Sequence, residues 1–281
     1  MNKLQIKLIA LDLDGTSLQN DHKTVSPRME CTLKAAVSAG IVVVPASGRP
    51  YRYLPPGIAS IRGIDYLVAS NGAVVYSRKQ DCPVCAKYIA EADVLWLLKN
   101  LPDSCPAEIW RDGKIYIQSF RSEMSGPIRP AHAAALRQLA AEVGNLCIFL
   151  QSNPGHIEKV NLPYLPPAIF PKLWDTLASY GKYTLLKAGT GIEVMAPGVT
   201  KASGLRMLCE YLSKSGFPVL QSEILAVGDS ANDIEMLRDC GIGIAMGNGE
   251  EAAKHAADKI TLPNTEDGAA LAIEKYALGK C

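Results

Sequence analysis

Apolar side chains fill most positions of the segment I-K-L-I-A-L-D-L, from Ile6 to Leu13. A nearly continuous apolar run is typical of a strand that is covered on both faces in a parallel sheet. Asp12 and Asp14 lie where the run ends, and Gly15 gives the backbone the freedom for a tight turn. Because side chains two positions apart in a strand point the same way, the two carboxylates are predicted to converge at the carboxyl edge of a sheet.

Ligands of open α/β folds bind at that edge, which favours a functional site. A plainer interpretation also fits, since Asp-x-Asp-Gly occurs in loops that cap a helix or form an Asx-turn. The acidic turn alone does not decide between the two.

Strands and amphipathic helices alternate in both terminal parts of the chain. Three other apolar runs, residues 41–44, 66–69 and 224–227, also end in small polar residues. Further strands are expected at residues 241–245 and 259–261. Helices are expected at residues 27–40, from Thr200, from 234, at 250–257 and at 266–278.

The pattern changes to short strands and turns from about residue 73. Asp112-Gly113 between two apolar runs is a strong hairpin signal. The expected strands are residues 74–77, 109–111, 114–119, 146–150, 182–187 and 192–195, and the expected helices are residues 92–100, 131–143 and 169–180. This middle segment is predicted to be a separate α+β unit.

The charge of the chain is nearly balanced, with 29 Lys and Arg against 28 Asp and Glu among 281 residues. Without a basic run, nucleic acid and anionic membranes are not favoured as partners. No apolar stretch is long enough for a membrane span and no signal peptide is recognisable, so a cytoplasmic protein is expected. The pattern does not indicate an oligomeric state.

Eight cysteines are spread along the chain, and only Cys82-Pro-Val-Cys85 has the spacing of a metal or redox motif. A zinc site would need a second ligand pair at matching spacing, and the sequence offers none. The two cysteines are therefore predicted to be free thiols at a turn.

Lys201 lies in the first turn of a predicted helix, where the helix dipole disfavours a cation. Its position hints at a negatively charged neighbour. Residues 228–233, Gly-Asp-Ser-Ala-Asn-Asp, form a second acidic cluster at the end of a predicted strand.

Four segments taken in order, Asp12–Thr16, Ser47–Arg49, Lys201 and Gly228–Asp233, resemble the four motifs of the haloacid dehalogenase (HAD) superfamily. Within it, the chain is similar to the Cof-type hydrolases, which carry a subclass IIB cap. The resemblance implies an α/β fold: a Rossmann-like three-layer core with a central parallel sheet, residues 1–79 and 196–281, plus an inserted α+β cap domain for substrate specificity, residues 80–195.

The resemblance further implies a Mg²⁺-dependent phosphatase that hydrolyses small phosphorylated metabolites, such as sugar phosphates or cofactor phosphates. Asp12 is the implied nucleophile, and the aspartyl-phosphate it forms splits one difficult displacement into two easier ones. Asp14 is the implied general acid and then the general base, which requires a raised pKa for its carboxyl group.

Carboxylate and phosphate repel each other, so a divalent cation is needed to hold both. The implied ligands of Mg²⁺ are Asp12, the main-chain oxygen of Asp14, and Asp229, a set of hard oxygen donors. Asn232 and Asp233 would orient these ligands or their waters.

Ser47, the backbone of Gly48, and Lys201 are implied to hold the phosphoryl oxygens, which would account for the unusual place of the lysine. Arg49 and Asn71 are further candidates for contact with the ligands or the substrate.

Two alternatives remain open from the sequence. A phosphomutase of the phosphomannomutase type has a similar architecture, and a catalytically silent binding or regulatory module could keep the same fold. The intact aspartates and Lys201 argue against the silent module.

Other polar residues are assigned no role in catalysis. The four histidines, His22, His132, His156 and His255, lack metal-ligand spacing and are predicted to be structural or surface residues. Arg111, Lys114, Glu158 and Lys159 could contact polar groups of a substrate, but a solvated face is the expected explanation for each of them.

Overall fold

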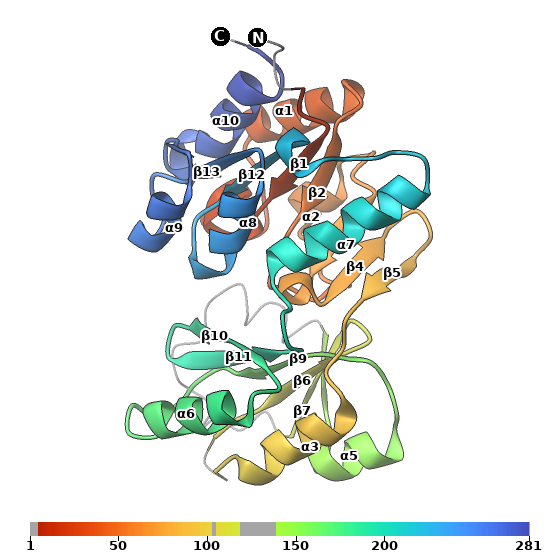
Figure 1. The fold of residues 1–281 in the computed structure, drawn as a ribbon, viewed down its shortest axis with the longest axis vertical. Coiled ribbons are helices and arrows are strands. Elements are labelled where there is room, and N and C mark those ends of the chain that lie inside the picture. Colours follow the sequence, from red (N-terminus) through yellow and green to blue (C-terminus); the bar gives the residue numbers. More distant parts are fainter. Residues whose placement is uncertain (1–4, 103–104, 119–138, 281) are drawn as a thin grey trace. The chain divides into compact units, whose positions relative to one another are not determined.

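The computed structural model describes residues 5–102, 105–118 and 139–280. The contacts between residues group the chain into two compact units (Figure 1). The first unit contains residues 1–86 and 200–281, and the second contains residues 87–199.

A parallel sheet forms the centre of the first unit, and its strands are β1 (Leu8–Leu11), β2 (Val42–Pro45), β12 (Ile224–Gly228), β13 (Ile242–Ala245) and β14 (Lys259–Ile260). Their order is β14-β13-β12-β1-β2. β1, the first apolar run, is therefore an interior strand, and the predicted central parallel sheet is confirmed.

Helices cover both faces of this sheet, and they are α1 (Pro27–Ser38), α2 (Pro56–Ala59), α7 (Lys201–Lys214), α8 (Ile234–Asp239), α9 (Glu251–Ala256) and α10 (Gly268–Tyr276). Ile9 and Leu11 pack in a buried cluster with α1 and α10, whereas Leu8 and Ala10 pack with α7, α8 and α9. Each buried leucine or isoleucine stabilises the fold by about 1.5–3 kcal/mol. Alternate side chains of β1 point to opposite faces of the sheet, and a layer of helices packs on each face. The sheet and its two helical layers are the three predicted layers.

A small antiparallel sheet extends the first unit, with strands β3 (Tyr66–Ala69), β4 (Val74–Ser77) and β5 (Cys82–Ala86). A parallel bridge between Ala46 and Val68 joins it to the end of β2. Cys82 and Cys85 lie on β5 as free thiols, so the expectation of a turn at this motif is wrong.

The second unit contains one mixed sheet, with strands β6 (Glu108–Arg111), β7 (Lys114–Ile117), β8 (Ala140–Glu142), β9 (Ile157–Leu162), β10 (Thr184–Ala188) and β11 (Gly191–Met195). The order is β10-β11-β9-β6-β7-β8. Asp112 and Gly113 both have positive φ, at 51° and 75°, and make the predicted hairpin.

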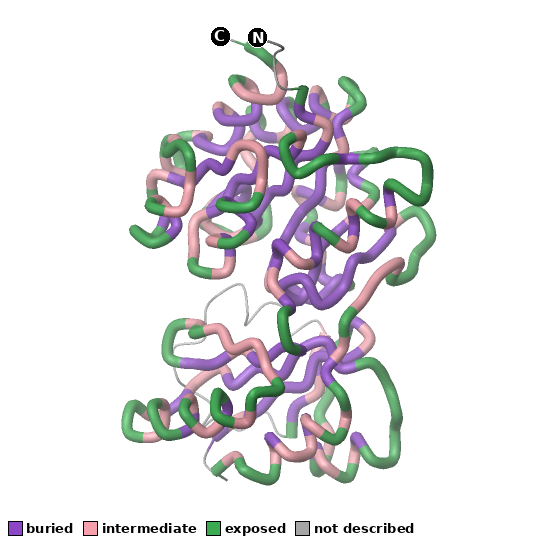
Figure 2. Tube along the Cα trace, in the orientation of Figure 1, coloured by how far each residue is buried: buried purple, intermediate pink, exposed green. Residues whose placement is uncertain are grey.

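The helices α3 (Glu91–Asn100), α5 (Leu146–Ser152) and α6 (Phe170–Tyr180) lie on one side of this sheet (Figure 1). In both units the strands are mostly buried and the outer sides of the helices are exposed (Figure 2).

Two expectations for the second unit are wrong, and one strand was not predicted. Leu146–Leu150 is helical, because the side chain of Asn145 accepts a hydrogen bond from Ile148 N at 3.0 Å and caps α5. Part of the predicted helix 131–143 lies outside the described residues, and Ala140–Glu142 forms a strand beside β7. The sequence analysis also missed the interior strand β9, because charged residues interrupt its apolar pattern.

We expect Gly72→Ala to destabilise the first unit strongly. Gly72 has φ +100°, and an added Cβ would lie 2.0 Å from the carbonyl oxygen of Thr200. Gly40 is the matched control, since it has φ +78° with nothing within 4 Å of an added Cβ. Gly40→Ala should cost about 1 kcal/mol for the left-handed backbone alone, and Gly72→Ala at least about 2 kcal/mol more. Urea unfolding measures both, and equal losses would contradict the role of this backbone contact.

Candidate active site

The parallel register brings three strand ends to one edge of the sheet. Leu11 pairs with Pro45 of β2 and with Val227 of β12. Asp12 continues the ladder, because its N–H donates to the Val227 carbonyl at 3.0 Å. The residues that follow each strand, including Ser47 and Asp229, are therefore delivered to the same edge as Asp12.

The turn after β1, Leu13–Ser17, packs against Asp229. Gly15 has φ +80°, and an added Cβ would lie 2.6 Å from Asp229 Oδ2, so only glycine fits here. Thr16 Oγ1 donates to Asp229 Oδ1 at 3.1 Å, and Ser17 Oγ donates to the Asp12 carbonyl at 2.8 Å. These contacts hold the first acidic turn against the second.

Lys201 is the cation at the centre of the site. Its fully buried Nζ lies 2.5 Å from Asp12 Oδ1 and 2.7 Å from Asp233 Oδ1. Burial alone would lower the pKa of Lys201, but the charges and hydrogen bonds of the two aspartates raise it above its usual value. The lysine is thus charged, and the negatively charged neighbour expected from the helix dipole is this pair of carboxylates.

Asp233 orders the loop that follows β12. Its Oδ2 accepts hydrogen bonds from the N–H groups of Asp229 and Ser230, both at 3.0 Å. Because Oδ1 contacts Lys201, both oxygens of this fully buried carboxylate are engaged. Asp233 therefore positions Asp229 and Lys201 relative to each other.

Asn71 connects the end of β3 with the ends of β2 and β12. Its backbone is in the left-handed region, with φ 56°, which asparagine tolerates better than most residues. Asn71 N donates to the Ser47 carbonyl at 3.0 Å, and Asn232 Nδ2 donates to Asn71 Oδ1 at 3.2 Å. An added Cβ on Gly48 would lie 2.9 Å from Asn71 Oδ1. The structure thus brings Ser47, Gly48, Asn71 and Asn232 together.

Asp12, Asp229 and Asp233 form an acidic cluster in which one carboxylate oxygen from each lies within 4.8 Å of the others. Burial and the charge of Asp233 raise the pKa of Asp229 to about 6. Burial also raises the pKa of Asp12, against the opposing effect of Lys201.

Asp12 Oδ2 is buried and has no hydrogen-bond partner among the described residues. Three carboxylates with one lysine leave an excess of negative charge, and an orphaned carboxylate oxygen is a hard ligand. The cluster therefore fits a divalent metal ion.

Asp14 lies beside the cluster in a different electrostatic setting. Arg49 donates to both of its oxygens, with Nε 2.8 Å from Oδ2 and one terminal nitrogen 2.5 Å from Oδ1. Burial would raise the pKa of Asp14, but the hydrogen bonds and charges of Arg49 and His22 hold it below its usual value. The expectation of a raised pKa is wrong for this arrangement, because Arg49 pairs with both oxygens of the carboxylate.

A sequence model of the haloacid dehalogenase-like hydrolases matches residues 9–273. The chain belongs to this family. The predicted superfamily and the predicted class of enzyme are confirmed.

Curated relatives extend over nearly the whole chain. The 5-amino-6-(5-phospho-D-ribitylamino)uracil phosphatase YitU of Bacillus subtilis is 30% identical, with 96% of this chain and 97% of the relative covered. The phosphatase YcsE of the same organism, named for the same substrate, is 26% identical, with 98% and 97% covered. A solved haloacid dehalogenase-like hydrolase from Bacteroides thetaiotaomicron is 27% identical, with a TM-score of 0.81 and 96% and 99% coverage. The two relatives from Bacillus subtilis are thus named as phosphatases of a small phosphorylated metabolite.

His22 is the residue of this site that the sequence analysis missed. Its Nδ1 lies 2.8 Å from Asp14 Oδ1, and its carbonyl accepts a hydrogen bond from Arg49 at 3.0 Å. The available signal was its place in the loop between the acidic turn and α1. His132 lies outside the described residues, and the contacts of His156 and His255 are with Asp112 and the Glu251 carbonyl.

Five residues of the second unit share one face of its sheet, which we name the polar sheet face: Glu108, Trp110, Lys159, Asn161 and Glu193. Lys159 Nζ lies 2.8 Å from Glu193 Oε1 and 3.6 Å from the centre of the Trp110 ring. Asn161 Nδ2 donates to Glu108 Oε2 at 2.9 Å.

A solvated face was expected for charged residues in this region. Glu158 and Lys159 are instead fully buried, and Arg111 is only 9% exposed. Lys114 is exposed, as expected.

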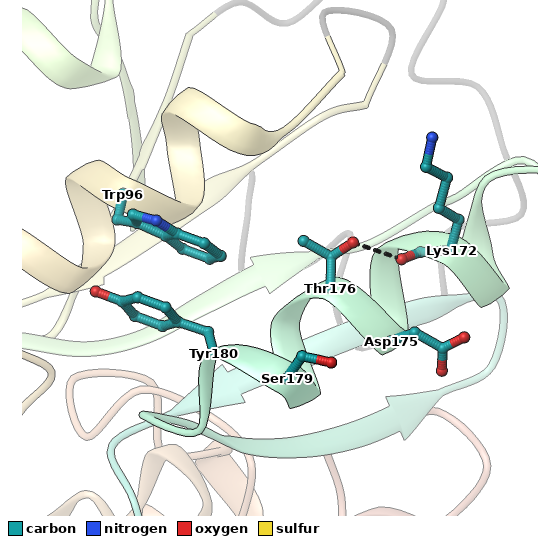
Figure 3. Close-up of a pocket in the computed structure, with 6 residues that line it drawn as sticks. All are labelled: Trp96, Lys172, Asp175, Thr176, Ser179 and Tyr180. Atoms are coloured by element: carbon teal, nitrogen blue, oxygen red, sulfur yellow. Dashed lines mark hydrogen bonds between the residues drawn. The ribbon is translucent and has the colours of Figure 1, made fainter.

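A shallow groove of about 750 Å³ lies on the helical side of the second unit, lined by Trp96, Lys172, Asp175, Thr176, Ser179 and Tyr180 (Figure 3). Trp96 of α3 stacks on Tyr180 of α6 with ring centres 3.8 Å apart. None of the predicted site residues lines it. In the part of the chain that the structure describes, no helix is long and apolar enough to cross a membrane.

Lys201→Met should destabilise the protein by about 3–5 kcal/mol, because it leaves the buried carboxylates of Asp12 and Asp233 without their cation. The matched control is Lys34→Met, which removes an ion pair with Glu30 whose side chains are 57% and 41% exposed. That change should leave the unfolding midpoint nearly unchanged, because the pair is exposed to solvent. Denaturant unfolding in the presence of EDTA compares the two, and a loss as small as the control would contradict the central role of Lys201.

Proposed function

We propose that this hydrolase is a Mg²⁺-dependent phosphatase of small phosphorylated metabolites, with Asp12 as its nucleophile. The observation that carries the proposal is the state of the Asp12 carboxylate. One oxygen is held by the buried Lys201, and the other is buried with no hydrogen-bond partner in the described part of the chain. A carboxylate held by a lysine and otherwise without a partner can present one oxygen to phosphorus and the other to a divalent cation.

In the first half of the reaction, Asp12 attacks the phosphorus atom, the bond from phosphorus to the ester oxygen breaks, and Asp14 gives a proton to that oxygen. In the second half, Asp14 takes a proton from water as the water oxygen attacks phosphorus. The bond between phosphorus and Asp12 then breaks, which releases phosphate and restores the carboxylate. For both steps a substrate or water oxygen must replace Arg49 at Asp14 Oδ2, and without the arginine the burial of Asp14 favours uptake of a solvent proton before the first step.

Asp12, Asp229 and the main-chain oxygen of Asp14 would hold Mg²⁺, an all-oxygen set that suits this ion. When bound, the ion neutralises the negative charge that the carboxylates and the phosphate share. Asp233 has both oxygens engaged by Lys201 and by backbone N–H groups, so it orders the site around the ion.

Ser47, the Gly48 N–H and Lys201 would bind the phosphoryl oxygens. These donors come from the end of β2 and the start of α7, which the Asn71 loop ties together through Gly72. Rigid donors of this kind stabilise the charge that develops during the transfer.

The second unit is proposed to act as the cap that selects the substrate. The polar sheet face supports this role, because buried charges cost stability and are retained mainly where they serve a function. Its carboxylates, amide and lysine have the hydrogen-bonding groups that recognise hydroxyl or amide groups of a small metabolite. The names of the relatives support small phosphorylated metabolites as the substrate class.

Asp12→Asn should lower Mg²⁺-dependent phosphate release by at least about 10³-fold, because the amide cannot form the phosphoryl intermediate. The control is Asp239→Asn, which changes a 39% exposed aspartate paired with Arg206. A malachite-green assay over a panel of phosphorylated metabolites, with and without EDTA, gives the rates. Release that continues in Asp12→Asn would reject Asp12 as the nucleophile, and an isomerised sugar phosphate as the product would indicate a mutase.

Glu193→Gln should change the ranking of substrates, with ratios of kcat/KM between panel members shifting by about 5-fold or more. The change removes a negative charge from the polar sheet face and leaves an acceptor for Lys159. Asp175→Asn is the matched control, since it removes one negative charge from the groove on the helical side (Figure 3). Equal rankings in the two variants would argue against substrate selection by this face.

A further inference from the structure

His22 contacts the carboxylate that the proposed mechanism uses for proton transfer. Asp14 Oδ1 lies 2.8 Å from His22 Nδ1 and 2.5 Å from one terminal nitrogen of Arg49. Asp14 Oδ2 receives Arg49 Nε at 2.8 Å. The histidine therefore engages one oxygen of the pair, whereas the arginine spans both.

The backbone at His22 is also held in place. Its φ of 57° lies in the left-handed region, which is strained for a non-glycine residue. Two hydrogen bonds fix this conformation: Arg49 donates to the His22 carbonyl at 3.0 Å, and His22 N donates to the Gln19 carbonyl at 2.9 Å. The loop thus presents the imidazole to Asp14 from a defined position.

We propose that His22 is a positioning residue for Asp14, whose imidazole N–H holds Oδ1 so that Oδ2 is the oxygen that exchanges the proton. An ionised carboxylate only accepts hydrogen bonds, so Nδ1 carries the hydrogen. When a substrate oxygen replaces Arg49 Nε at Oδ2, the bond from His22 keeps the carboxylate in place. Oδ2, which takes up a proton from solvent once Arg49 Nε has left, then gives that proton to the ester oxygen and later takes one from water. This inference rests on the proposed function, in which Asp14 is the acid and base.

The consequence is a dependence on the leaving group. An ester whose leaving oxygen is stable as an anion needs little protonation, whereas an alkoxide leaving group needs the acid. The value of kcat/KM reports the first half of the reaction. If Asp14 is no longer held in position, kcat/KM should therefore fall much more for benzyl phosphate than for p-nitrophenyl phosphate.

The test compares these two substrates in Mg²⁺-loaded full-length protein. His22→Gly keeps the left-handed backbone but removes the imidazole, and should lower kcat/KM for benzyl phosphate about 10–100-fold. The value for p-nitrophenyl phosphate should stay within about 3-fold of the unmodified enzyme. His22→Asn places an amide N–H near the position of Nδ1 and tolerates the same backbone, so it should restore most of the benzyl phosphate activity. His255→Asn, on α9, is the control and should change neither rate.

Asp14→Asn separates failure of this inference from failure of the proposed function. It should show the same selective loss, at least as large as in His22→Gly. If Asp14→Asn slows both substrates equally, the acid role of Asp14 is rejected, and the inference falls with it. If Asp14→Asn is selective but His22→Gly slows both substrates equally, or neither, the positioning role alone is overturned.

His22→Gln keeps the test decisive if His22→Gly folds poorly, as checked by its unfolding midpoint. Glutamine offers a donor at the place of Nε2 rather than Nδ1, so it should show the selective loss of the glycine variant. Full benzyl phosphate activity in His22→Gln would overturn the inference.

Discussion

The buried ammonium group of Lys201, between the carboxylates of Asp12 and Asp233, is the interaction on which the site depends. A charge buried without a partner would cost several kcal/mol, so each member of this group needs the others. Asp233 in turn accepts hydrogen bonds from the loop after β12. A single ionic cluster thus ties together the end of β1, the start of α7 and the acidic loop.

The same cluster explains why neighbouring aspartates can have different tasks. Asp12 is buried beside Lys201 and keeps one oxygen open, whereas Asp14, two residues later, pairs with Arg49 and His22. Burial raises the pKa of the first carboxylate, and the arginine and histidine lower the pKa of the second. Asp12 is thereby suited to attack and metal binding. Asp14 is suited to exchange its hydrogen-bond partner and a proton.

The second unit also contains buried charged side chains that are held by partners, here on a sheet. Its interior strand β9 carries Glu158 and Lys159, both fully buried, and Asn161. Hydrogen bonds, the carboxylate of Glu193 and the ring of Trp110 compensate for the lost solvation of Lys159 and Asn161. An apolar strand would be the simpler way to build a core, so this arrangement supports the proposed role in substrate selection.

The parallel core, the family and the residues at the strand ends could be predicted from the sequence, because apolar runs and the residues that follow them are local features. Parallel strands end at one edge of a sheet, so Asp12, Ser47 and Asp229 could be grouped without coordinates. The folded chain was needed to see that Arg49 and His22 lower the pKa of Asp14, that residues 146–152 are helical and that β9 is a buried charged strand. The pKa of Asp14 and the buried charges of β9 depend on partners distant in the chain, which no spacing along the sequence encodes, whereas the Asn145 cap is a local signal that the apolar pattern outweighed.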